Sequence, residues 1–203
     1  HRRGEETALG NLRADLTRAA RPGSDVAVLN GGSLRAGLPA GPLRYGGFYE
    51  AFPFDNGFAT LRMPAGYLAM RLARSFERSS ALVLVSGVRV RARCEGGRVD
   101  VTLTRTDGSL IHDFDPLVVT TSDYLATGGD GFFGKHDATI ENGAPMRDAM
   151  VDVLRQRGGK LDPSDPRVFD RARPRIDLPG PVPVRCYLSK PQAVALPGGT
   201  AQP

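Results

Sequence analysis

The sequence predicts a mixed α+β fold and not a doubly wound parallel sheet. Three segments have the apolar spacing of amphipathic helices, and several others are short apolar runs or alternate apolar with polar side chains, as strands do. Two of the predicted strands follow each other directly as a hairpin, so helices and strands do not alternate strictly along the chain. We therefore expect helices packed on sheets of mixed strand direction.

The first predicted helix covers residues 5–20, where Leu9, Leu12 and Leu16 fall on one face and Pro22-Gly23 ends the pattern. Gly10 lies inside this helix, where glycine is less stable than alanine, so we expect a close packing contact at that position. Residues 26–29 are uniformly apolar and predict a buried strand.

The middle and end of the chain contain the remaining predicted elements. Residues 59–63 alternate as a half-buried strand, and Pro64 opens a helix that extends to about residue 78. Residues 88–94 and 99–103 form an alternating hairpin with arginines on one face, and residues 117–121 form a short apolar strand. Pro145 opens the last helix, and Gly158-Gly159 ends it.

Length and composition favour one globular domain. Of the 203 residues, 40% are hydrophobic and 24% are charged, which is ordinary for a folded domain. We assign residues 1–178 to the domain and residues 179–203, rich in proline and glycine, to an extended tail or linker. No apolar run is long enough to span a membrane. Because the chain begins with His1 and not Met, we expect further sequence upstream.

The net charge of +5 suits anionic ligands, but the arginines are scattered. The densest set alternates along one strand, at Arg89, Arg91 and Arg93, where a solvent-exposed face is the more common explanation than a polyanion site. We therefore expect no nucleic-acid partner. Cys94 and Cys186 lack the spacing of a zinc site, and the sequence leaves open whether they form a disulfide.

The first candidate site follows the predicted strand 26–29. Asn30-Gly31-Gly32 would let a ligand approach the backbone, because glycine has no Cβ, and consecutive N–H groups in such a turn can bind an anion. Asn30 adds a donor and an acceptor, and Arg35 adds a guanidinium. The alternative is a tight turn with Arg35 in solvent, because short glycine motifs have many false positives.

Two further stretches place aromatic rings among turn-forming residues. Phe54 lies in Pro53-Phe54-Asp55-Asn56-Gly57, at the end of a cluster of aromatic residues that would otherwise read as core. Phe132 follows the glycine-rich stretch 127–131, which contains Gly129 and Asp130. A ring in a turn either anchors that turn or offers a face to a ligand.

Four segments carry a resemblance to a known family. They are Glu6-Thr-Ala-Leu-Gly-Asn-Leu12 with Ala14-Asp15, Asn30-Gly-Gly-Ser-Leu-Arg35 followed by Gly41-Pro-Leu-Arg-Tyr-Gly46, Phe52-Pro-Phe-Asp-Asn56, and Thr127-Gly-Gly-Asp-Gly-Phe132. In this order, over residues 5–176, the chain resembles the C-terminal domain of the 5′-nucleotidase family, which includes the bacterial UDP-sugar hydrolases. Each motif alone is weak, but four with sensible spacing are specific.

The resemblance implies a layered α/β domain, with two mixed sheets between helices, that recognises the nucleoside part of a substrate. It implies that the base stacks between Phe54 and Phe132, at about 1–3 kcal/mol for each ring. It also implies substrate contacts from the Asn-Gly-Gly and Gly-Gly-Asp-Gly motifs and from an acid that matches Asp137; the motif residues are Asn30, Gly31, Gly32, Arg35, Gly129 and Asp130. Two departures are Glu5, where some relatives have an arginine, and Ser33, where relatives usually have glycine.

By the same resemblance, hydrolysis belongs to a separate N-terminal domain that binds two divalent metals. This chain has three histidines, with no paired ligand spacing among them, so we expect no cofactor or metal in it and no catalytic residue. The expected partners are a nucleotide or nucleoside and that metallophosphatase domain, and the expected location is extracellular, cell-surface or periplasmic. The alternatives are a free-standing nucleotide-binding module without catalysis and a basic surface domain that binds polyanions.

Overall fold

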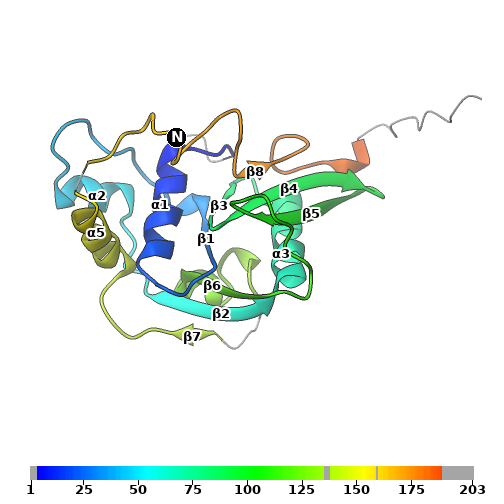
Figure 1. Ribbon diagram of the computed structural model, residues 1–203, viewed down its shortest axis with the longest axis horizontal. Coiled ribbons are helices and arrows are strands. Elements are labelled where there is room, and N and C mark those ends of the chain that lie inside the picture. Colours follow the sequence, from blue (N-terminus) through cyan, green and yellow to red (C-terminus); the bar gives the residue numbers. More distant parts are fainter. Residues whose placement is uncertain (1–3, 135–137, 159, 189–203) are drawn as a thin grey trace, which may run out of the picture.

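The computed structural model describes residues 4–134, 138–158 and 160–188. It contains two mixed sheets (Figure 1). The larger has the strand order β3-β1-β6-β2-β7, formed by β1 (Val26–Asn30), β2 (Phe58–Pro64), β3 (Val83–Ser86), β6 (Pro116–Ser122) and β7 (Thr139–Ile140). The smaller has the order β5-β4-β8, formed by β4 (Val88–Glu95), β5 (Arg98–Arg105) and β8 (Ile176–Asp177).

Both sheets combine parallel and antiparallel pairs. β1 runs parallel to β6 and antiparallel to β3, and β2 runs antiparallel to β6. In the smaller sheet, β4 is antiparallel to β5 and parallel to β8. This confirms the expected mixed fold with helices and two mixed sheets, in which long-range pairing, and not strict βαβ succession, sets the strand order.

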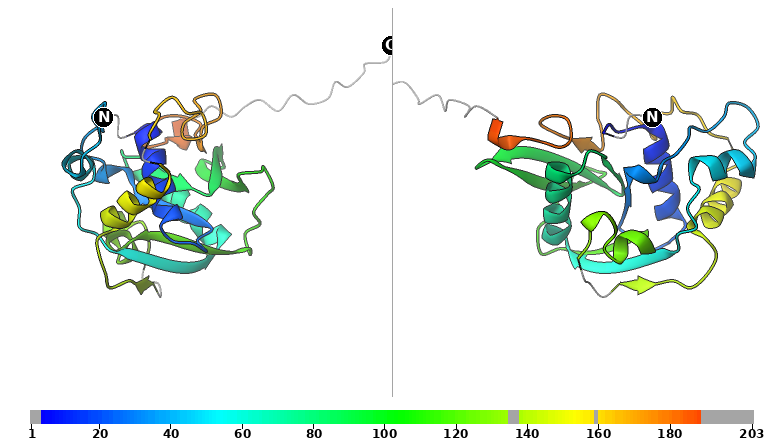
Figure 2. Two further views of the ribbon diagram at one scale, coloured as in Figure 1. Left: turned by 60° about the vertical axis from the view of Figure 1, so that its left-hand side comes forward. Right: turned by 180° about the vertical axis from the view of Figure 1, so that it is seen from behind.

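Three helices cover one face of the larger sheet. A fourth helix packs against its other face, together with the smaller sheet. Helices α1 (Ala8–Ala19), α2 (Tyr45–Ala51) and α5 (Met146–Gln156) share a core cluster with Leu29 and Leu84 of the sheet. Helix α3 (Ala65–Arg78) shares the other cluster with Val28 of the larger sheet and Val90 of the smaller one. Figures 1 and 2 show α1, α2 and α5 together at one end of the molecule and α3 beside β4 and β5 at the other.

The long helices occur where the apolar periodicity predicted them. α1 begins after Thr7, whose side chain accepts a hydrogen bond from the Gly10 amide at 3.1 Å. A Cβ on Gly10 would lie 2.8 Å from Leu84 Cδ2, which confirms the expected close contact. In α3, Leu68, Leu72 and Phe76 are buried, as their spacing predicted.

Several short elements were not predicted. They are α2, α4 (Asp123–Ala126), β3, β7, β8, and the 3-10 turns η1 (Gly31–Ser33), η2 (Gly129–Gly131) and η3 (Cys186–Leu188). Residues after 178, which we assigned to the tail, make contacts with the domain. The amide of Val184 donates to the Phe76 carbonyl at 2.8 Å, and Cys186 forms a disulfide with Cys94. Packing therefore continues beyond residue 178 to at least Cys186, because these contacts fasten the segment to α3 and β4.

Candidate functional site

The strand order brings three of the four motifs to one edge of the larger sheet. β1 and β6 are parallel, so the segments that follow Asn30 and Ser122 leave the sheet at the same edge. β2 is antiparallel to β6 with Phe58 opposite Ser122, so the turn that precedes Phe58 lies at this edge too. In open sheets such an edge, beyond the carboxyl ends of parallel strands, is a common place for ligands.

A hydrogen-bond network joins two of these segments. Asn30 Nδ2 donates to Asp130 Oδ2 at 3.0 Å, and the Tyr124 hydroxyl donates to Asp130 Oδ1 at 2.7 Å. The Asp130 carboxylate raises the pKa of Tyr124 chiefly through this second hydrogen bond, because it stabilises the protonated phenol. Asp130 thus orients both the Asn30 amide and the Tyr124 ring.

Backbone geometry explains the glycine next to Asp130. Asp130 itself has a φ of 53°, a left-handed conformation that aspartate tolerates better than most residues. A Cβ on Gly129 would lie 2.5 Å from the carbonyl oxygen and from ring atoms of Tyr124. The tight turn at this position therefore requires glycine at 129.

The Asn-Gly-Gly loop and the Phe54 turn meet through a cation–π contact. The Arg35 guanidinium carbon lies 5.0 Å from the centroid of the Phe54 ring, and the Phe54 residue is 38% exposed. After Asn30, the chain makes a 3-10 turn in which Gly31 is buried and Gly32 is half-buried. A Cβ on Gly32 would meet only the Asn30 side chain, at 3.9 Å, so the space above that residue is open.

Phe132 does not present an open ring in this structure. It is 5% exposed and packs edge-on against Phe133, with the ring centroids 4.7 Å apart. Arg71 of α3 donates to the carbonyls of Gly131 and Phe132 and fastens the loop above this pair. The ring of Phe132, which the resemblance implies to be a stacking face, belongs in this structure to the core cluster that includes α3. Asp137 lies outside the described residues.

Sequence reasoning missed Arg147, which holds the Phe54 turn in place. Its side chain is 5% exposed, and its Nη1 donates to the carbonyls of Phe52 and Phe54 at 3.1 and 3.3 Å. Its Nη2 lies 2.7 Å from Asp55 Oδ1, and its Nε donates to the Tyr45 hydroxyl at 3.0 Å. Burial by itself would lower the pKa of Arg147, but the contacts with Tyr45 and Asp55 raise it above its usual value.

Asp123, which directly follows β6, binds the end of the same turn. Its carboxylate accepts a hydrogen bond from Asn56 Nδ2 at 2.9 Å and from the Gly57 amide at 3.0 Å. The only local signal for it was its place after the strand 117–121. Arg147 had none, because all of its partners lie more than 90 residues earlier in the sequence.

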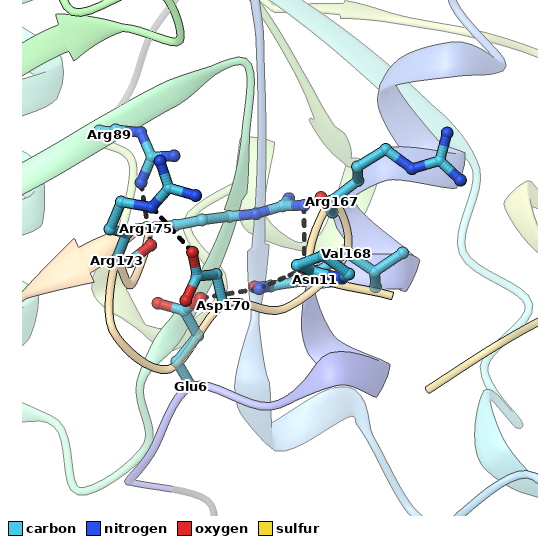
Figure 3. Close-up of a pocket in the computed structure, with 9 residues that line it drawn as sticks. Glu6, Asn11, Arg89, Arg167, Val168, Asp170, Arg173 and Arg175 are labelled. Carbon is cyan, nitrogen blue, oxygen red and sulfur yellow. Dashed lines mark hydrogen bonds and ion pairs between the residues drawn. The ribbon is translucent and has the colours of Figure 1, made fainter. Parts of the chain in front are cut away.

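A cavity of about 250 Å³ lies away from this edge and is lined by several arginines, whose guanidinium groups already have partners in the described part of the chain (Figure 3). Arg175 bonds both oxygens of Asp15 at 2.6 and 2.8 Å, and Arg173 Nε lies 2.8 Å from Asp170. Figure 3 shows Arg167 pointing away from this group. These contacts fasten the segment before β8 onto α1 and β4, so we assign the cavity a structural role.

Over the described part of the chain, no group of three or more His, Cys, Asp or Glu side chains is arranged to hold a metal ion. Within the same ranges, no helix has the length and apolarity needed to cross a bilayer.

This fold and its edge define a mixed α/β domain whose exposed ring, guanidinium and amide are suited to ligand recognition. A family model described as "5′-nucleotidase, C-terminal domain" matches residues 1–135. The chain belongs to this 5′-nucleotidase C-terminal domain family.

Individual relatives agree with this assignment. The trifunctional nucleotide phosphoesterase protein YfkN of Bacillus subtilis is 26% identical over an alignment of 178 positions that covers 80% of this chain and 12% of that protein. A 5′-nucleotidase precursor from Thermus thermophilus has a similar structure, with a TM-score of 0.67, 25% identity, and coverage of 88% of this chain and 36% of that one. The NAD nucleotidase of Haemophilus influenzae shares the fold, with a TM-score of 0.67, 18% identity, and coverage of 86% of this chain and 33% of that one. The chain thus spans a minor part of each relative.

Proposed function

We propose that this chain is the nucleotide-recognition domain of a 5′-nucleotidase-type phosphoesterase. The observation that carries the proposal is the Phe54 ring, which is 38% exposed in a turn and has the Arg35 guanidinium 5.0 Å from its centroid. An exposed aromatic face stacks a base of any identity, and a nearby guanidinium attracts the phosphate of the same ligand.

The residues that surround this ring support a polar contact beside the stacking face. Asn30, held by Asp130, would bond the ribose or the base, and the open space above Gly32 would let the ligand approach the backbone closely. Gly129 permits the turn that places Asp130. We propose that Phe132 supports the site from below, since its 5% exposed ring packs beneath the loop that carries Asp130.

We further propose that hydrolysis takes place on a separate N-terminal metallophosphatase domain with two divalent metals, to which this domain delivers the phosphate. The parent protein would act outside the cytoplasm, at the cell surface or in the periplasm. The Cys94–Cys186 disulfide supports this location, because disulfides persist in oxidising compartments. The designation of a structural relative as a precursor supports it as well.

The test compares the binding of adenosine and AMP to the 203-residue chain and to its Phe54→Ala variant by NMR titration. Loss of one stacking face should weaken both ligands by about 1–3 kcal/mol, or roughly fivefold to 150-fold. Phe114→Ala is the matched control, because Phe114 is 94% exposed and lies by the opposite ends of β2 and β6. Equal effects of the two substitutions would contradict the stacking role.

The catalytic part of the proposal has its own test. The purified chain with Mg²⁺, Mn²⁺ or Zn²⁺ should leave AMP intact, whereas the parent protein with its N-terminal domain should release phosphate. If the parent gene encodes no such domain, the chain would instead be a binding module without catalysis. Metal-dependent hydrolysis of AMP by the chain alone would overturn this division of roles.

A further inference from the structure

A buried arginine lies directly behind the Asn-Gly-Gly loop. Arg13 of α1 is 4% exposed, and its Nη1 donates a hydrogen bond to the Ser33 hydroxyl. Its guanidinium carbon lies 5.2 Å from the centroid of the Phe52 ring. Its Nε is buried and has no hydrogen-bond partner within the described ranges.

No carboxylate of the described residues forms an ion pair with Arg13. Among the described residues, the ion pairs of the molecule involve other arginines, and the contacts given for Arg13 are the neutral Ser33 and Phe52. Burial lowers the pKa of Arg13 to about 10, which still leaves the side chain protonated at neutral pH. A buried charge without a counter-charge is costly, so it is rarely retained for stability alone.

The position of Arg13 connects it to the proposed ligand site. The Ser33 hydroxyl, which accepts from Arg13, donates in turn to the Asn30 carbonyl oxygen. Asn30 is the residue whose side chain bonds Asp130. The Ser33 hydroxyl therefore bridges the buried guanidinium to the loop backbone.

We propose that Arg13 is a positioning residue of the ligand site, which fixes the Asn30–Ser33 loop through Ser33 and favours an anionic ligand at that loop through its uncompensated charge. The inference rests on the proposed function and adds a source of selectivity for nucleotides over nucleosides. The field of a charge in a low-dielectric interior is screened less by solvent than that of an exposed group such as Arg35. Arg13 therefore acts on the ligand without touching it.

The test uses Arg13→Met, which preserves the aliphatic volume and removes the charge, with Ser33→Ala as the matched variant that keeps the charge and removes the bridge. The affinities of the full chain for AMP and for adenosine are measured by NMR titration at fixed ionic strength. Arg13→Met should weaken AMP about tenfold more than adenosine. Ser33→Ala should weaken the two ligands to a similar extent, because it loosens the loop and leaves the charge in place.

Thermal unfolding of the same variants separates positioning from simple structural support. Arg13→Met should unfold at the wild-type temperature or above it, because it removes an uncompensated buried charge. Arg13→Gln is a second neutral variant in case the methionine packs poorly. If both neutral variants fail to fold, Arg13 is a structural residue and the inference is wrong.

The remaining outcomes distinguish this inference from the proposed function. If the wild-type chain binds both ligands and Arg13→Met leaves the ratio of their affinities unchanged, the Arg13 inference alone fails. If the wild-type chain binds neither ligand at millimolar concentration, the proposed function fails and the Arg13 inference fails with it. Selective loss of AMP binding in a folded Arg13→Met variant supports both.

Discussion

Replacement of Arg147 by methionine tests how the Phe54 turn is built. Arg147 donates to the carbonyls of Phe52 and Phe54, to the Tyr45 hydroxyl and to Asp55, and all of these interactions are lost in Arg147→Met. Removal of one partner of a buried ionic contact costs about 3–5 kcal/mol. The Asp55 side chain is 68% exposed and is readily rehydrated, so we expect the lower end, about 3 kcal/mol.

In a domain of this size, such a loss should lower the unfolding temperature by about 6–12 °C, measured by circular dichroism. The affinity for adenosine should fall as well, since the carbonyls that Arg147 holds belong to Phe52 and Phe54. Asp55→Asn is the control: it removes the exposed carboxylate but leaves the backbone contacts, so its cost should stay below about 1 kcal/mol. Similar destabilisation by both substitutions would show that the ion pair, and not the carbonyl contacts, supports the turn.

Three further changes test other parts of the structure. Gly129→Ala should destabilise the domain by about 1–3 kcal/mol and weaken AMP binding, because the new Cβ would overlap the Tyr124 carbonyl; unchanged stability in urea unfolding would refute the geometry. The pKa of Tyr124 is raised in the folded state by its hydrogen bond to Asp130. The stability that this bond contributes is therefore fully present below the ordinary tyrosine pKa of about 10 and is lost as the pH rises through the higher folded-state pKa. Tyr124→Phe should therefore remove part of the alkaline loss of stability seen in wild-type melting curves. Replacement of Cys94 and Cys186 by alanine should lower the free energy of unfolding by about 2–4 kcal/mol, because the disulfide closes a sequence separation of 92; no change under non-reducing conditions would argue that the bond does not form.

Sequence patterns located the long elements well because each buries one regular face. The spacing of Leu68, Leu72 and Phe76 identified α3, and alternation identified β4 and β5. β3 was missed because it is a short, fully buried run close to the end of α3, and periodicity alone does not distinguish such a run from a helical segment. α2 was missed because it is short and contains two glycines. β7 and β8 are two residues long, and only the neighbouring strands define them.

The candidate site was predictable where local chemistry is unusual and unpredictable where partners are distant. Asn30 and Phe54 were found because glycines and turn formers surround them. Arg13 and Arg147 were not singled out, because an arginine within an amphipathic helix reads as a solvent-facing residue until its distant partners are known. For Phe132 the local sequence was not sufficient. Phe132 and Phe133 follow a glycine-rich loop, and nothing in that pattern indicates that both rings are buried in the core.

The distribution of arginines in the structure bears on the alternative of a polyanion-binding surface. Arg91 and Arg93 both lie near one carboxylate of Asp177, at 3.7 and 2.6 Å, and Arg89 donates to backbone carbonyls, so β8 and the segment before it compensate much of the basic strand. Arg35 and the buried Arg13 are instead gathered behind and beside the Asn-Gly-Gly loop. Charge concentrated at one edge suits a small anion, whose binding should weaken only gradually as salt is raised, whereas a polyanion spread along β4 would give a steep salt dependence. A titration of AMP binding against salt concentration therefore separates the two functions through its slope.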